Sequence, residues 1–160
     1  EQMAREAMER LRFSHDMTER VAHLVRQHMF DYRPGWTDAA VRRFIRSVGV
    51  DQIADLFDLR IADNLGNGLK TGFPHYLEEL RARVEAILEA EEALSVRDLV
   101  VDGTDVMTTL DIPPGPKVGE ILNQLLEEVL ENPSLNRRET LLTRIRTGFS
   151  VDTHGSRDLG

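Results

Sequence analysis

The sequence predicts an all-α protein. Apolar residues recur at three- and four-residue spacing along most of the 160 residues, and no segment keeps the alternating pattern of a half-buried strand. The pattern changes near residue 93, where long periodic segments give way to short ones. We therefore expect a multi-helix bundle over 1–92, a smaller helical subdomain over 93–146 and a flexible tail over 147–160.

Five helices are predicted in the first part, and most have a start or stop signal. Asp16 with Glu19 is typical of a capping box, Thr37 is a favourable N-cap, and Gly49 can end a helix in a left-handed conformation. Pro74 fits a first helical turn. The expected helices cover residues 1–11, 16–30, 37–48, 51–66 and 74–92. Because helical spacing starts with the first residue, we expect the sequence to be part of a longer protein.

Shorter elements are predicted in the second part. Pro116 can occupy the first position of the longest of them, which carries a continuous apolar stripe. Asn136 with Glu139 is a second capping-box pattern and should open the last helix. The expected elements cover residues 96–101, 104–110, 116–131 and 136–146.

Composition limits the classes of function. A net charge of −8 disfavours a surface uniformly adapted to nucleic acid, although local basic clusters can still bind it. The absence of cysteine excludes disulfides, thiolate metal sites and cysteine nucleophiles. No apolar run approaches the roughly 18 residues of a membrane span. We expect a cytoplasmic protein without a membrane partner.

Three places are candidates for binding phosphate. They are the arginine-rich segments in the expected helices 37–48 and 136–146, and the start of the expected helix 116–131. Arg42 and Arg46 lie one helical turn apart and away from the apolar stripe, so their guanidinium groups should point outward. Lys117 lies in the helical turn that Pro116 begins, where free backbone N–H groups and the helix dipole attract anions. The alternative is that these basic residues are simply exposed to solvent on a helix face and bind no RNA. The candidate RNA-binding residues are Arg42, Arg43, Arg46, Lys117, Arg137 and Arg138.

His28 and Asp63 are candidate metal ligands. Each lies at helical spacing from apolar residues, so both could point to an interior where an imidazole nitrogen and a carboxylate oxygen bind a divalent cation. Two ligands do not complete a site, and a hydrogen bond between the two side chains is the simpler explanation. The neighbouring pair His15-Asp16 precedes a helix, where local capping accounts for it.

Three blocks of residues resemble the HD-type and following region of bacterial class II tRNA nucleotidyltransferases, the family of CCA-adding enzymes and poly(A) polymerases. The resemblance spans about residues 9–145, and the joint order of the blocks is more specific than any one of them. The blocks are Glu19 to Phe30 with Trp36 to Arg46; Asp55 to Asp63 followed by Gly66-Asn67-Gly68; and Gly103-x-Asp105, Pro114-Gly115-Pro116 and Asn136-Arg137-Arg138-Glu139.

The resemblance implies a parent enzyme that adds CMP and AMP to tRNA 3′ ends and uses magnesium in an amino-terminal head. The partners that it implies are tRNA and that head. It also implies that residues 1–92 are a truncated HD-like domain, in which His28 and Asp63 match the later His and the final Asp of the metal site. Gln27 stands where relatives often have a second His, so a complete site is not expected.

No catalytic residue is assigned to this chain. Nucleotidyl transfer needs two Asp residues separated by one residue, so that two cations can clamp the triphosphate. The sequence contains no Asp-x-Asp, and Asp102 and Asp105 have a different spacing. We therefore expect no cofactor in this chain and no activity of its own.

Three hypotheses remain open at this stage. The first is the tRNA-binding, structural portion of a nucleotidyltransferase that lacks the catalytic head. The second is a degenerate HD-type metal-dependent phosphohydrolase that keeps His28 and Asp63. The third is a scaffold or dimerisation domain.

Overall fold

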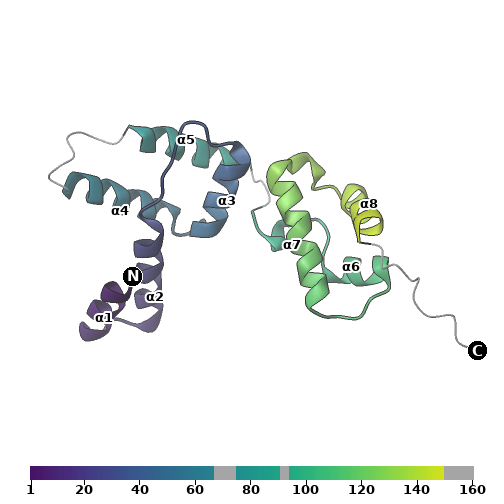
Figure 1. Ribbon diagram of the computed structural model, residues 1–160, viewed down its shortest axis with the longest axis horizontal. Helices are drawn as coiled ribbons and strands as arrows, with labels where there is room; N and C mark the ends of the chain where they lie inside the picture. Colours follow the sequence, from purple (N-terminus) through teal and green to yellow (C-terminus); the bar gives the residue numbers. More distant parts are fainter. Residues whose placement is uncertain (67–74, 91–93, 150–160) are drawn as a thin grey trace, which may run out of the picture. The chain divides into compact units, whose positions relative to one another are not determined.

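The computed structural model describes residues 1–66, 75–90 and 94–149, which fold into eight α-helices and two short 3-10 helices (Figure 1). No strand occurs among these residues, so the predicted all-α class is confirmed. The chain divides into two compact units, residues 1–91 and 92–160. Within the described ranges, no helix is both long enough and apolar enough to cross a membrane.

The described residues of the first unit form five helices, and α2 to α5 supply the residues of its apolar core. α3 and α5 pack together, and α2 contacts both α3 and α4. Fully buried Val41, Ile45, Leu56 and Leu80 come from three of these helices. The predicted start at Pro74 and the Asn67-Gly68 turn lie outside the described residues. The helices are α1 (Gln2–Arg10), α2 (His15–Gln27), α3 (Asp38–Val48), α4 (Ile53–Gly66) and α5 (Tyr76–Glu89).

The helix starts in this unit follow ordinary capping chemistry. Thr37 accepts a hydrogen bond from the Ala40 N–H at 3.2 Å, which confirms it as the N-cap of α3. The expected cap at Asp16 is wrong, because α2 begins one residue earlier and Ser14 is its N-cap. Gly49 follows α3 with φ of 95°, a conformation that glycine adopts without a Cβ penalty.

A buried tyrosine ties the segment between α2 and α3 to α5. The Tyr32 hydroxyl donates to a Glu79 carboxylate oxygen at 2.7 Å, and an Arg83 nitrogen lies 3.3 Å from the same hydroxyl. Arg83 also donates to Asp38 at 2.6 Å. That bond holds the pKa of Asp38 below its usual value, whereas burial raises the pKa of Tyr32. The Trp36 ring packs edge-on against Tyr32, with 5.3 Å between centroids.

Polar side chains of α2 satisfy carbonyl groups at the end of α3. The His23 Nε2 atom lies 2.9 Å from the Val48 carbonyl oxygen, and Arg20 donates to the Asp51 carbonyl at 3.1 Å. Arg20 also pairs with Asp55 at 2.6 Å. The last carbonyls of a helix have no partner within it, so the His23 bond satisfies one of them at the end of α3, and Arg20 bonds to the segment that follows α3.

The second unit is built around α7, whose apolar stripe contacts α6 and α8. α7 begins at Pro116, as predicted. Gly103 begins α6 close to α7, because a Cβ at that position would lie 3.3 Å from Val118 Cγ1. The elements are η1 (Val96–Asp98), α6 (Gly103–Leu110), α7 (Pro116–Glu131), η2 (Pro133–Leu135) and α8 (Arg138–Gly148).

Three expectations for the second unit are corrected. The element predicted over 96–101 is a single 3-10 turn that ends at Asp98. The last helix begins at Arg138 and continues to Gly148, so the predicted tail starts inside a helix. The Asn136–Glu139 capping box does not form, because the Asn136 side chain bonds to the segment before α6 instead.

Candidate nucleic-acid interface

The arginines of α3 occupy three different environments. Arg42 is 8% exposed, Arg43 is half-buried and Arg46 is exposed. All three interact with other groups of the protein. The expectation that Arg42 points outward is therefore wrong. Its stem lies on the buried face of α3, beside Val41 and Ile45, so it cannot present an open guanidinium to a phosphate chain.

The start of α8 is held to the segment between η1 and α6 by side chains. Asn136 accepts from the Val100 N–H and donates to the Asp98 carbonyl, both at 3.0 Å. Arg138 makes two bonds to the Asp105 carboxylate and one, at 3.3 Å, to the Val100 carbonyl. The Arg138 guanidinium lowers the pKa of Asp105. Arg138 is thus engaged in joining two parts of the second unit.

The start of α7 is open to an anion. Gly115 is its N-cap and supplies no side-chain hydrogen bond, and the first turn contains no acidic residue. Pro116 has no N–H, and the Val118 N–H bonds to the Gly115 carbonyl at 3.1 Å. Lys117 is exposed in this turn. A positive side chain therefore stands beside the positive end of the helix dipole without a neighbouring carboxylate on that turn.

Arg137 is the second exposed cation in this unit that fits the prediction. It lies at the N-cap position of α8 and its side chain makes no cap bond. Among the described residues, neither Arg137 nor Lys117 takes part in an ion pair. Arg46 and Arg138 are exposed as well, but each already interacts with another group of the protein.

His28 and Asp63 do not bond to each other. The His28 Nδ1 atom lies 2.6 Å from the Val25 carbonyl oxygen, one turn earlier in the chain. Asp63 pairs with Arg60 at 3.4 Å. The expected His–Asp hydrogen bond is therefore wrong. In the described parts of the chain, no group of three or more His, Asp or Glu side chains is arranged to hold a metal ion.

Arg60 is a buried cation that the sequence patterns above did not single out. It is 9% exposed, and its guanidinium lies 5.6 Å from the centroid of the Phe30 ring. Its Nη1 atom contacts Met29 Sδ at 3.6 Å and Asp63, while its Nε is buried without a hydrogen-bond partner in the described structure. Its spacing from Leu56 and Phe57 on the interior face of α4 could have revealed it.

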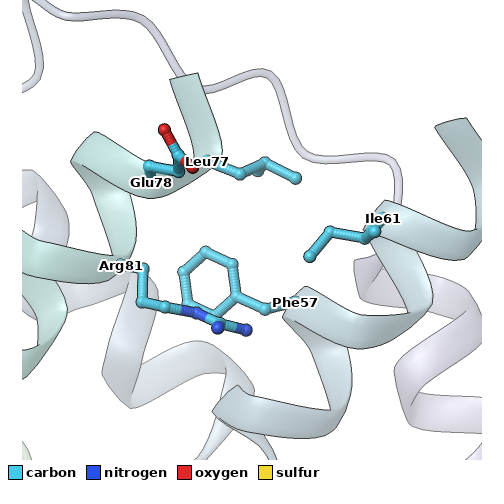
Figure 2. A pocket seen from close by; sticks show the side chains of 5 residues that line it. All are labelled: Phe57, Ile61, Leu77, Glu78 and Arg81. Carbon is cyan, nitrogen blue, oxygen red and sulfur yellow. The ribbon is translucent and has the colours of Figure 1, made fainter. Parts of the chain in front are cut away.

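A small pocket opens between α4 and α5 (Figure 2). Phe57, Ile61 and Leu77 supply apolar walls, with Glu78 and Arg81 at the side. The Arg81 guanidinium lies 5.3 Å from the Phe57 ring centroid. The cavity measures about 110 Å³, well below the roughly 300 Å³ of an ordinary small-ligand site, so it is too small for a nucleotide.

The described residues form two all-α units, and the second of them has exposed cations at two helix starts. Residues 1–145 match the family described as tRNA nucleotidyltransferase domain 2, putative. The chain belongs to this family, and the predicted resemblance to tRNA nucleotidyltransferases is confirmed.

Two curated proteins are similar to this chain. A CC-adding tRNA nucleotidyltransferase of Thermus thermophilus is 37% identical over 159 residues, which cover 98% of this chain and 35% of that protein. A CCA-adding enzyme of Streptococcus mutans is 38% identical over 65 residues, 39% of this chain and 16% of that protein. The chain thus spans about a third of the first relative's length and less of the second's. No solved structure matches it.

Proposed function

We propose that this chain is the tRNA-binding, structural portion of a cytoplasmic nucleotidyltransferase that adds nucleotides to tRNA 3′ ends. The observation that carries the proposal is the similarity to the Thermus CC-adding enzyme over 98% of the chain. Catalysis and its magnesium belong, in this proposal, to a further portion of the polypeptide. The sequence contains no Asp-x-Asp pair that could bind two cations.

The open start of α7 supports a role in holding the RNA backbone. Lys117 and the uncapped first turn offer positive charge and backbone donors together, which suits a phosphate. Arg137 adds a planar guanidinium that can bind phosphate oxygens in pairs. Phosphate contacts of this kind position an RNA without reading its sequence. Arg43 and Arg46 are secondary candidates, since each already has an interaction within the protein.

The test is tRNA binding as a function of salt concentration. Each phosphate contact adds about one unit to the slope of log K against log salt, so Lys117→Ala and Arg137→Ala should each lower the slope by about one. Affinity should fall for all tRNAs alike, because these contacts do not read bases.

Arg33→Ala is the matched control. Arg33 is exposed but bonded to Asp31 through two nitrogens, at 2.7 and 3.0 Å, so its charge is already neutralised locally. The control should leave the slope unchanged. Binding that ignores salt, or that ignores both Lys117 and Arg137, contradicts the proposal.

A further inference from the structure

Met29 differs from the other methionines in what its sulfur contacts. The sequence contains five methionines, all of them within the described residues. In the described part of the chain, Met29 is the one methionine whose sulfur accepts a hydrogen bond, from Arg60 Nη1 at 3.6 Å. The residue is also 67% exposed, so much of the side chain is open to dissolved oxidants. An oxidisable sulfur therefore lies directly against a cation.

The Arg60 guanidinium has more hydrogen-bond donors than acceptors to receive them. Its acceptors among the described residues are the Met29 sulfur and an Asp63 carboxylate oxygen at 3.4 Å. Its Nε atom is buried and has no hydrogen-bond partner in the described structure. A thioether sulfur is a weak acceptor, and 3.4 Å is long for a hydrogen bond between charged groups. This cation therefore has unused capacity to donate.

Aromatic packing holds Arg60 in place. The residue is 9% exposed, and its guanidinium lies over the Phe30 ring, 5.6 Å from the centroid. That ring packs against Phe44 and Phe57, with 4.9 and 6.5 Å between centroids. A cation is attracted to an aromatic face, and a side chain that is already immobilised loses little further freedom when it gains an acceptor. Arg60 is thus preorganised to bind a stronger acceptor where the Met29 sulfur now lies.

We propose that Met29 is a site of reversible oxidation and that Arg60 binds the oxygen of its sulfoxide. Hydrogen peroxide is the oxidant: the Met29 sulfur attacks one peroxide oxygen, the O–O bond breaks and an S–O bond forms. The sulfur loses two electrons, the departing hydroxide takes the proton from the transferred oxygen, and the products are the sulfoxide and water. The sulfoxide oxygen is polar and accepts hydrogen bonds, so a charge-assisted bond from Arg60 replaces the weak contact with sulfur.

Oxidation should tighten the contact between the end of α2 and α4. Met29 lies just beyond α2, and Arg60 is in the second half of α4. The new bond exists only while these two segments are in contact, so local opening of α4 must break it. A sulfoxide inside a core would disrupt packing, but Met29 is mostly exposed and keeps its contacts with water. The modification therefore stabilises this contact instead of damaging it.

Hydrogen exchange in the complete polypeptide, as its gene encodes it, tests the proposal. Dilute hydrogen peroxide forms the sulfoxide, and peptide mass spectrometry verifies it at Met29. Backbone amides in the second half of α4 should then exchange about tenfold more slowly, the factor expected from one charge-assisted hydrogen bond to a partly exposed group. Methionine sulfoxide reductases, one for each sulfoxide epimer, should return the exchange rate to its starting value.

Met29→Leu is the matched control, because leucine keeps a similar size without the sulfur. Peroxide still oxidises the exposed Met3 and Met17 in this variant, and the exchange of α4 should not change. Met29→Gln places an amide oxygen at the same position and should slow the exchange without peroxide. Combining each variant with Arg60→Leu should remove the difference between them, which attributes the effect to the guanidinium.

Three results would overturn the proposal. They are exchange of α4 that is unchanged or faster once Met29 is oxidised, an equal slowing in Met29→Leu, and a Met29 that peroxide does not oxidise in the complete polypeptide. If Arg60→Leu does not fold, the unsubstituted protein and Met29→Leu decide the question. None of these measurements involves tRNA, so the oxidation site stands or fails separately from the proposed function.

Discussion

Asn136 gives the sharpest test of how the second unit is held together. Its side chain accepts from the Val100 N–H and donates to the Asp98 carbonyl, both at 3.0 Å. These two bonds join the start of α8 to a segment almost 40 positions earlier in the chain. Asn136→Ala removes both bonds and leaves the apolar core untouched.

The expected loss follows from the number and exposure of these bonds. A net hydrogen bond contributes about 0.5–1.5 kcal/mol. Val100 is 43% exposed, so water can replace part of what is lost. We expect the free energy of unfolding of the second unit to fall by about 1–2 kcal/mol, which corresponds to a decrease in Tm of roughly 5–15 °C for a unit of this size.

The assay can separate the two units because of where the aromatic residues lie. The single tryptophan, Trp36, is in the first unit. Its fluorescence during urea unfolding therefore follows that unit, whereas far-ultraviolet circular dichroism follows both. Asn136→Ala should move part of the circular dichroism transition to lower urea and leave the Trp36 transition unchanged.

Asn123→Ala is the control for this prediction. Asn123 is exposed on α7 and donates to the Gly119 carbonyl of its own helix at 2.8 Å. Alanine is the better helix former, so stability should change by less than about 0.5 kcal/mol. An unchanged circular dichroism transition in Asn136→Ala, or an equal shift of the Trp36 transition, would refute the reasoning.

Three further predictions follow from single contacts. Tyr32→Phe removes the hydroxyl that bridges Glu79 and Arg83, so the free energy of unfolding of the first unit, measured by Trp36 fluorescence in urea, should fall by about 1 kcal/mol. An unchanged urea midpoint contradicts this. Arg138 lowers the pKa of Asp105, so the pair stabilises the fold above the unfolded pKa near 3.9, and this contribution disappears as pH falls through the folded pKa. Arg138→Met should therefore destabilise the second unit at pH 7, with a difference from wild type that shrinks under acid; a difference independent of pH in denaturant titrations would count against the pair. Gly103→Val should lower the free energy of unfolding of the second unit, measured by circular dichroism, by about 1–3 kcal/mol, because the new side chain would meet Val118. Gly103→Ala should lower it by less.

Local signals in the sequence predicted much of the fold. Thr37 caps α3, Pro116 begins α7 and Gly49 adopts a positive φ, because each depends on the chemistry of one residue and its immediate neighbours. Apolar periodicity placed the helices for the same reason. The tRNA nucleotidyltransferase family was recognised from motif order alone, and the family match over 1–145 confirms it.

The roles of individual polar side chains depended on tertiary contacts. Asn136 and Glu139 have the spacing of a capping box, yet Asn136 bonds to residues 98 and 100. Arg138 looked like a phosphate ligand and is bonded to Asp105. A side chain chooses among all donors and acceptors that folding brings near, and the sequence shows only those close along the chain.

The sequence by itself determined most of the helical segments, where several of them begin and which family the chain belongs to. Only the tertiary structure decided which cations remain exposed. Periodicity places Arg42 relative to the stripe of its own helix, but it does not say which neighbouring helix covers that side, and Arg42 is buried. Lys117 is exposed on the first turn of α7, which has no acidic side chain, and no carboxylate pairs with it in the described structure.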